Sequence, residues 1–279
     1  MNDRFAWLDD LPFAGGPPDL RIGTHALDIS DWLPQDAQTA AELRLRVQLL
    51  DQHRDFVQMN AGYETALEEL LSLVEIHIGD RLQRDRPTPL EQLAVSVPDD
   101  VLLMAQDRAG SERKWRLVGG TLLFPNHWTL SEKMGSEITE IHAPVEGYDE
   151  LLAARVRKFF DRLSPARPAW RRNWFIHDDA TLFQPAPRQS RAITDPAEAA
   201  KLWIRSEWQT LRRLAFSGLI VFTIKTQVAP LSALVLRERK AAQMVTFLES
   251  ASTRALTNHG AHGRVEAILD VLRSGGGEW

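Results

Sequence analysis

The chain has 279 residues, and its 44% hydrophobic content is enough to bury the core of one large domain or two small ones. Its 33 basic and 38 acidic side chains give a formal net charge of −5, so no overall basic field draws the chain to nucleic acid or anionic lipid. The sequence contains no cysteine, which excludes disulfides, thiolate nucleophiles, iron–sulfur clusters and Cys-ligated zinc from this chain.

Signals for targeting or membrane insertion are also missing from the sequence. Met1–Asp10 lacks the basic start and the long apolar run of a signal peptide. The longest apolar stretch, near Leu214–Ile224, is too short to span a bilayer. We therefore expect a cytoplasmic protein that contacts neither membrane nor nucleic acid.

The first half of the chain predicts a wrapping segment, two helices and then strands. Pro and Gly punctuate residues 1–40, so we expect loop and short strand there. Apolar residues recur at three- and four-residue steps over Ala40–His53 and Glu64–Leu82, which is typical of amphipathic helices. Short apolar runs bounded by Gly, Asn and Pro favour strands at Val101–Met104, Trp115–Phe124 and Glu137–His142.

In the second half, alternating and β-branched runs predict strands, whereas three- and four-residue spacing predicts helices. The strands are Trp174–His177, Lys201–Gln209 and Leu219–Gln227, and the helices are Tyr148–Leu163, Thr210–Leu214, Val228–Phe247 and Arg264–Leu272. Helices at both ends of a central, antiparallel sheet make this an α+β fold.

The common motifs of nucleotide, zinc and serine chemistry do not occur. Gly119-Gly120 lacks the third glycine or the following Lys of a phosphate-binding loop. No His-Glu-x-x-His is present, and His259 and His262 lie in a Gly-rich loop. No Gly-x-Ser-x-Gly marks a nucleophile, although this leaves Ser–His–Asp catalysis open. A kinase, a Rossmann enzyme and a dedicated zinc site are therefore disfavoured.

The segment Phe124–Tyr148, centred on His142, is the first candidate site. His142 follows a predicted strand, and Pro144 would end the strand and fix the backbone. This arrangement would aim the imidazole into a pocket. The alternative is a hydrogen-bonded histidine at a strand end, and the residues alone leave both interpretations open.

A second candidate site lies further along the chain. If the strand at Lys201–Gln209 runs to its end, then Arg205, Glu207 and Gln209 share one face at period two. Such a row is costly in a core unless the residues bind a ligand or each other, and the alternative is a solvated sheet face. The nearby tryptophans either line a pocket or belong to the core, and these are Trp170, Trp174, Trp203 and Trp208.

Several blocks, taken together, resemble the haem-dependent oxidative N-demethylase α-subunit family over about residues 10–240. The blocks are Gly23-x-x-x-Leu27-Asp28, Trp32-Leu33-x-x-Asp36, Phe124-Pro125-x-x-Trp128, Lys133-x-Gly135, Ile141-His142-x-Pro144-Val145, Arg171-x-Asn173-Trp174, Arg205-x-Glu207-x-Gln209-Thr210-Leu211-x-Arg213-Leu214 and Phe222-Thr223-Ile224. Because they occur in the family's order, the resemblance is specific.

The resemblance implies a PAS-like domain that binds haem b and removes a methyl group from a small secondary amine, releasing formaldehyde. It implies electrons from NADPH, delivered through reductase or ferredoxin-type partner subunits that carry flavin and iron–sulfur groups. Residues 1–40 would wrap, 41–250 would form the haem domain with helical additions, and 251–279 would be a C-terminal helix and flexible tail. The alternatives are a haem-binding PAS-like sensor and a non-catalytic scaffold subunit.

Matching positions carry the family's site residues over to this chain. His142 is expected to be the axial iron ligand, with His127 in reserve. The resemblance implies that Arg171, Arg205 and Arg213 pair with the haem propionates. It also implies that Trp174 contributes to cofactor binding. Glu207 is expected to be catalytic, by accepting a hydrogen bond from the amine or by relaying protons.

The chain departs from the family pattern at several polar positions. Trp208 and Ala215 stand where the family tends to have Arg and Pro, and Thr39 stands where Tyr is usual. Lys225-Thr226-Gln227 replaces Arg-Thr-Tyr. These changes are expected to affect haem anchoring and substrate choice while leaving the fold intact.

Overall fold

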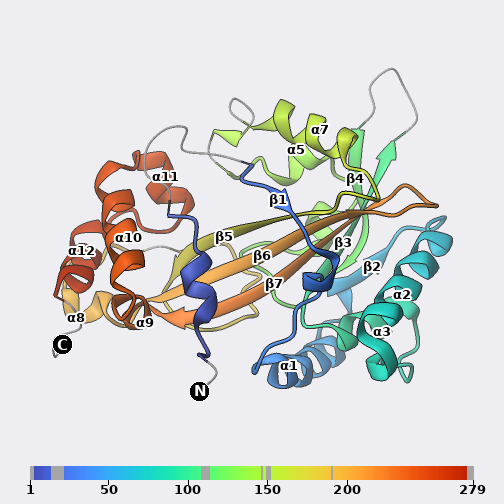
Figure 1. Cartoon of the computed structure of the whole chain (residues 1–279), viewed down its shortest axis with the longest axis horizontal. Helices are drawn as coiled ribbons and strands as arrows, with labels where there is room; N and C mark the ends of the chain where they lie inside the picture. Colours follow the sequence, from blue (N-terminus) through green and yellow to red (C-terminus); the bar gives the residue numbers. More distant parts are fainter. Residues whose placement is uncertain are drawn as a thin grey trace.

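In the computed structural model, which describes residues 3–13, 22–107, 114–145, 147–148, 152–189 and 191–274, one sheet runs through the molecule (Figure 1). Its seven strands are antiparallel and lie in the order β1-β5-β6-β7-β3-β4-β2. They are β1 (His25–Ala26), β2 (Val57–Met59), β3 (Asp100–Asp107), β4 (Lys114–Thr121), β5 (Ala169–His177), β6 (Trp203–Arg213) and β7 (Ile220–Pro230). The predicted α+β class with a central antiparallel sheet is confirmed.

Helices gather at the two ends of the long strands β5, β6 and β7 (Figure 1). Near one end lie α1 (Thr39–Gln52), α2 (Glu64–Ile78) and α3 (Pro89–Ser96), and near the other lie α8 (Pro196–Ala199), α9 (Leu231–Val235), α10 (Glu238–Ser250), α11 (Thr253–Asn258) and α12 (Val265–Arg273). Between β4 and β5 come α4 (Leu130–Lys133), α5 (Ile138–Ile141) and α7 (Ala153–Arg162). Short 3-10 helices are η1 (Ala6–Asp10), η2 (Ile29–Asp31), η3 (Arg54–Phe56) and η4 (Gly79–Arg81).

The unbroken register of β5, β6 and β7 assigns each side chain to one face of the sheet. Asn173 lies opposite Glu207, and Arg172 lies opposite Trp208. Since successive side chains of a strand alternate between faces, the odd-numbered residues of β6 point one way and the even-numbered residues the other. We call these two sides the Glu207 face and the Trp208 face.

The Glu207 face is covered by the segment that connects β4 to β5. Ile138 of α5 and Phe160 of α7 belong to the same buried apolar cluster as Leu211 and Ile224 of the sheet. Burying these side chains fixes the connecting segment over the face. The loop and short helices that carry His127 and His142 are thereby held above the row of polar β6 residues.

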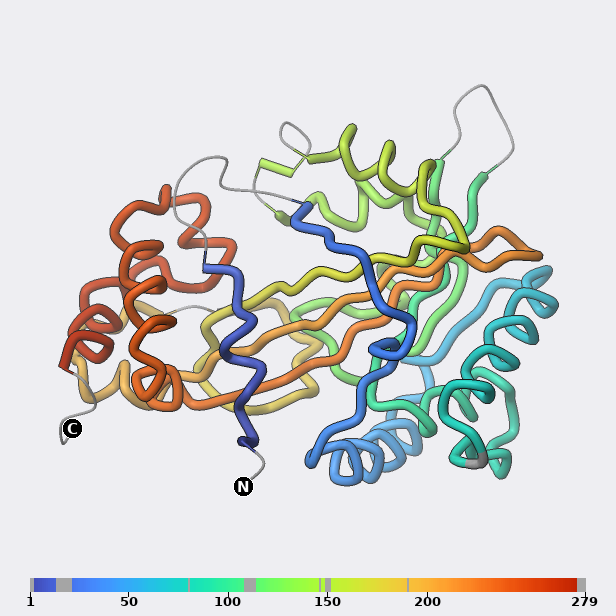
Figure 2. The backbone as a smooth tube through the Cα atoms, viewed as in Figure 1, coloured from blue at the N-terminus to red at the C-terminus, as the bar shows by residue number. Residues whose placement is uncertain are grey.

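The Trp208 face is covered by two separate apolar clusters. One joins Trp174 to α9–α12 and to the N-terminal segment that contains Trp7. Figure 2 shows this segment, in dark blue, crossing the long strands. The other cluster joins Val221 to the helices α2 and α3. Between the two clusters, the face is occupied by polar and aromatic side chains.

The structure corrects two predicted elements. The predicted strand Glu137–His142 is a short helix, because Glu137 and Glu140 form a reciprocal capping box in which Glu140 accepts from the Glu137 backbone N–H at 2.6 Å. His142 therefore follows a helix and not a strand. The predicted helix Thr210–Leu214 is wrong as well, since β6 continues to Arg213 and pairs there with Ile220.

The remaining boundaries agree in part with the sequence. The predicted helix Val228–Phe247 begins only after Pro230, because β7 stays paired with β6 up to that residue. The predicted helix Tyr148–Leu163 is observed as α7, and residues 149–151 lie outside the described part of the chain, as do residues 14–21 and 275–279 of the predicted terminal segments. The helix α3 and the strand β2 were not predicted.

Candidate functional site

Glu207 lies at the centre of a polar cluster on its face of the sheet. It is 7% exposed and accepts hydrogen bonds from Gln209 Nε2 at 2.8 Å and from Asn126 Nδ2 at 3.1 Å. The predicted row of Arg205, Glu207 and Gln209 on one face is thus observed. The Oδ1 atom of Asn126 is buried and has no partner among the described residues, so this cluster presents an unused acceptor.

Arg205 fastens the loop that carries Asn126. Its Nη2 donates to the carbonyl of Phe124 at 2.6 Å, and its Nη1 donates to the carbonyl of Leu182 at 3.0 Å. From the other side, the carboxylate of Asp100 accepts from the backbone N–H of Phe124 at 3.0 Å. The loop is therefore held at both its carbonyl and its amide groups, which fixes the position of Asn126 against Glu207.

His142 presents a fixed, neutral imidazole. Its Nδ1 lies 2.7 Å from the carbonyl of Ile138, so this nitrogen carries the proton and the Nε2 lone pair is left for another partner. The ring stacks on Tyr148 with centroids 4.6 Å apart. Burial lowers the pKa of His142, and the nearby positive charge of Arg171 lowers it further. This is the protonation state that a metal-ligating histidine needs.

A pair of histidines, His127 and His177, lies at the other end of the Glu207 face. His127, with a φ of 64°, holds its Nδ1 2.7 Å from the carbonyl of Ala186 and stacks on His177 at 5.3 Å. Burial, together with the charge of Arg205, lowers the pKa of His177 to about 2. Within the described ranges, the buried Nε2 of His177 has no partner. Sequence reasoning did not single out His177.

Arginines give this face an excess of positive charge. Arg171 is half-buried, and burial lowers its pKa while Glu207 opposes that shift. Burial lowers the pKa of Arg188 to about 10, while the carboxylates of Asp178 and, more weakly, Glu207 oppose that shift. With Arg205, the set has three cations around one carboxylate. Arg188 was missed because it lies in a Pro-rich loop, Pro185-Ala186-Pro187-Arg188, that carries no periodic signal.

Two residues assigned to the site by resemblance lie elsewhere. Arg213 is at the far end of β6, where its Nη1 donates to the carbonyl of Leu163 at 3.3 Å. Trp174 points to the Trp208 face and stacks on His259 at 4.1 Å within an apolar cluster. The structure therefore brings His142, Arg171 and Glu207 to one face, and places Trp174 and Arg213 apart from them.

The polar departures from the family pattern also lie away from the Glu207 face. Trp208, Lys225 and Gln227 point to the opposite face by strand alternation. Lys225 is fully buried and pairs with Glu42 of α1, and Thr39 of the same helix bonds to the Asp36 backbone N–H at 2.9 Å. These substitutions thus change a different surface of the sheet from the one that carries His142.

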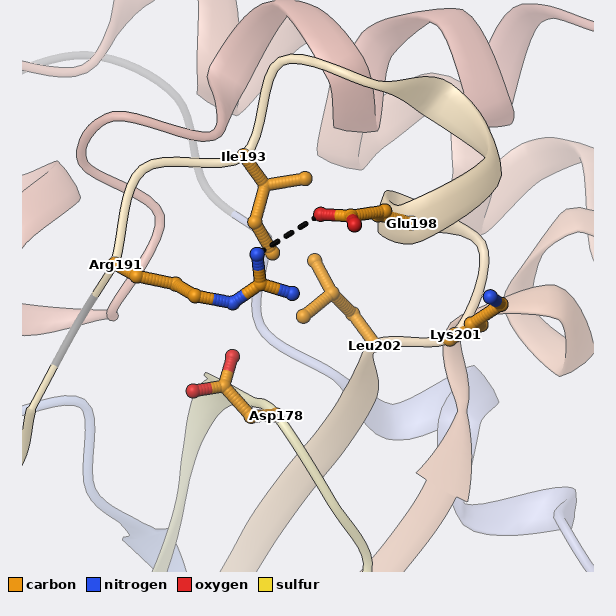
Figure 3. Close-up of a pocket in the computed structure, with 6 residues that line it drawn as sticks. All are labelled: Asp178, Arg191, Ile193, Glu198, Lys201 and Leu202. Atoms are coloured by element: carbon orange, nitrogen blue, oxygen red, sulfur yellow. Dashed lines mark hydrogen bonds and ion pairs between the residues drawn. The ribbon is translucent and has the colours of Figure 1, made fainter.

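A cavity of about 200 Å³ lies outside this site (Figure 3). It is lined by Asp178, Arg191, Ile193, Glu198, Lys201 and Leu202, and an ion pair of 2.9 Å joins Arg191 to Glu198 across it. None of these residues was predicted as a site residue.

A family model described as haem-dependent oxidative N-demethylase, alpha subunit-like, matches residues 75–269. The chain belongs to this family. The matched range contains the whole polar cluster on the Glu207 face, including His127 and His142. No curated protein matches the chain.

Family membership supports a haem-dependent oxidoreductase that is one subunit of a larger complex. Among the described residues, every helix is too short or too polar to cross a membrane. The same residues contain no group of three or more His, Cys, Asp or Glu side chains that would hold a bare metal ion. A single histidine is, by contrast, a sufficient protein ligand for haem iron.

Proposed function

We propose that this chain binds haem b on the Glu207 face and acts as the catalytic subunit in oxidative N-demethylation of a small secondary amine. The overall reaction combines the methylated amine with dioxygen, two electrons and two protons, and it yields the demethylated amine, formaldehyde and water. The electrons would come from NADPH through partner subunits with flavin and iron–sulfur groups, because this chain has no cysteine to hold a cluster.

The observation that carries the proposal is the state of His142. Its Nδ1–H is donated to the carbonyl of Ile138, its pKa is lowered, and its ring is held by Tyr148. These features leave an oriented Nε2 lone pair near the charge of Arg171, and a neutral imidazole held in this way would serve as the protein ligand of the haem iron. The residues present therefore suit the group that the family requires.

The arginines of this face suit the two propionates of haem. We assign Arg171 and Arg188 to them, since both carry charge near Glu207 without a close carboxylate partner of their own among the described residues. Arg205 has three backbone carbonyls as acceptors, at Phe124, Pro125 and Leu182, and its role is to position the loop. Arg213 and Trp174 support the fold around the site.

Bound haem would supply the centre at which dioxygen is reduced and the methyl group is oxidised. Glu207 would accept a hydrogen bond from the N–H of the amine, which is a cation at neutral pH. Asn126 and Gln209 hold the Glu207 carboxylate in place through their side-chain N–H groups. The unused Oδ1 of Asn126 offers a second acceptor for the same cation.

The strand order supports a PAS-like domain. Leaving out the short β1 and β2, the five long strands lie in the spatial order second, first, fifth, fourth, third, counted along the chain. The helical connection between the second and third of them, β4 and β5, covers one face. This order is the one expected of a PAS-like sheet with helices between its second and third strands, and His142 lies in that helical segment.

The first prediction tests the iron ligand. Purified protein supplied with haemin is expected to show a Soret band that His142→Ala shifts or abolishes, because the axial nitrogen is lost. The matched control is His127→Ala, which removes a histidine from the same face and is expected to leave the band in place. An unchanged spectrum in His142→Ala would overturn the assignment, and a spectrum lost only in His127→Ala would transfer the role to that residue.

The second prediction tests catalysis separately from haem binding. Glu207→Gln keeps the hydrogen-bonding shape but removes the charge, so we expect an unchanged Soret band and a loss of about 10²-fold or more in formaldehyde release from dimethylamine with a surrogate reductase. Haem-loaded wild-type protein that never turns over dimethylamine or related amines would instead favour a sensor or scaffold subunit.

A further inference from the structure

We propose that the Trp208 face carries a second ligand site, which takes the carboxylate of a small organic acid. The site is the cluster of Trp7, Trp170, Arg172, Trp208 and Gln227, which we call the Arg172 cluster. It lies between the two apolar clusters of that face, because Trp7 belongs to one of them and both Trp170 and Trp208 pack against the other. The sheet separates it from His142.

Arg172 is a buried cation whose ion pair is long and whose counter-charge is exposed. Its side chain is 5% exposed, and its Nη2 forms an ion pair of 3.9 Å with the largely exposed carboxylate of Asp10. Its Nη1 donates to Ser206 Oγ at 3.0 Å and to Gln227 Oε1 at 2.8 Å. Its Nε is buried and has no acceptor among the described residues. A buried guanidinium with an unsatisfied N–H group is stabilised when an anion binds to it.

Two indole N–H groups beside Arg172 lack acceptors as well. The guanidinium carbon lies 5.1 Å from the ring centroid of Trp208 and 5.9 Å from that of Trp7. The Nε1 atoms of both tryptophans are buried, with no acceptor within the described ranges. Together with Arg172 Nε, this makes three orphan donors on one guanidinium and the two rings beside it.

The chemistry of these groups selects the ligand. An indole N–H and a guanidinium N–H only donate, so a partner must be an acceptor. A single water molecule accepts at most two hydrogen bonds and carries no charge, so it can neither satisfy three donors nor neutralise the buried guanidinium. A carboxylate accepts at both oxygens, donates nothing and neutralises the charge.

The cluster is partly exposed and partly apolar. Trp170, Trp208 and Gln227 are half-buried, whereas Arg172 and Trp7 are buried. Trp170 stacks on Trp208 at 4.1 Å, which gives the entrance an aromatic edge for the organic part of the acid.

Calorimetric titration of the full, haem-loaded chain with benzoate and with acetate tests the proposal, and benzamide serves as the uncharged control. Saturable binding of at least one carboxylate is expected at millimolar concentration, with a change in tryptophan fluorescence, an unchanged Soret band and no response to benzamide. Binding that is absent for both carboxylates, or equal for benzamide, would overturn it.

Variants on the two faces separate this site from the haem site. Arg172→Gln is expected to weaken carboxylate binding at least tenfold, and Trp208→Phe, which removes one donor but keeps an aromatic ring, to weaken it severalfold. Arg171→Gln changes the neighbouring residue on the opposite face and is expected to alter the Soret band only. Wild-type affinity in both Arg172→Gln and Trp208→Phe would contradict the site, whatever the haem spectrum shows.

Discussion

Replacing Asp100 by alanine is expected to lower the free energy of unfolding by about 3–5 kcal/mol, because it leaves a buried arginine without its counter-charge. Asp100 and Arg46 are both 0% exposed, and their ion pair measures 2.8 Å. Arg46 keeps other bonds, including one of 2.6 Å from Nε to the Ala94 carbonyl, but these acceptors are neutral. Urea denaturation of the variant measures the loss.

The matched control is another aspartate–arginine pair of similar length. Asp51 pairs with Arg86 at 2.6 Å, and the Asp51 side chain is 52% exposed. Asp51→Ala is expected to cost about 1 kcal/mol or less, since water screens and replaces the interaction. A second comparison is the double variant Arg46→Met/Asp100→Leu, which removes both charges and is expected to cost less than Asp100→Ala. Equal losses for Asp51→Ala and Asp100→Ala would contradict the argument.

The same substitution reaches the functional site. The Asp100 carboxylate accepts from the backbone N–H groups of Leu123, at 2.7 Å, and Phe124, at 3.0 Å. Without it, two backbone N–H groups of the loop that presents Asn126 to Glu207 lose their acceptor, and the loop keeps its bonds to Arg205 and to the segment around Gln184. We therefore expect weaker haemin binding in Asp100→Ala even at temperatures where the variant remains folded. The buried pair thus contributes to the position of the site as well as to stability.

The row on β6 could be predicted from the sequence because strand alternation is a local property. Arg205, Glu207 and Gln209 follow one another at period two, and the register with β5 and β7 keeps that alternation intact. The same rule, applied to Arg171-x-Asn173-Trp174, separates Trp174 from Arg171. The resemblance nevertheless assigned Arg171 and Trp174 of this block to one haem pocket, whereas strand alternation places them on opposite faces.

Other placements depend on contacts that no local pattern reports. The predicted helix at Thr210–Leu214 would have kept Arg213 near Glu207, whereas six residues of strand, at about 3.3 Å each, carry it about 20 Å away. Arg188 and His177 reach the site because β5 pairs with β6 and a Pro-rich loop folds back over it. The helix before His142 depends on a capping box of two glutamates in a run that also suits a strand.

A buried carboxylate outside the site gives the second large effect. Asp99 is 0% exposed, and neither of its oxygens has a hydrogen-bond partner among the described residues. Burial raises its pKa from 3.8 to about 7, although the charges of Lys225 and Arg46 oppose the shift. In the unfolded chain the pKa returns to its ordinary value, so folding favours the protonated acid.

The sign of the pH dependence follows from proton counting. Between the two pKa values the folded chain holds a proton on Asp99 that the unfolded chain has released. The free energy of unfolding therefore falls as pH rises through this range, and the stability that the bound proton contributes is lost above about pH 7. Asp99→Asn cannot ionise. Its free energy of unfolding, relative to wild type, is expected to rise by roughly 2–3 kcal/mol from pH 5 to pH 8.

Urea denaturation at several pH values measures this difference, and Asp55→Asn, at an exposed position, is the control expected to track wild type. Using a difference between variants cancels the other groups that titrate in the same range, among them Glu42, whose pKa is also raised by burial. Parallel curves for Asp99→Asn and wild type would show that Asp99 is ionised in the folded protein. In that case Lys225 would have to neutralise two carboxylates, those of Glu42 and Asp99, across the α1–sheet interface.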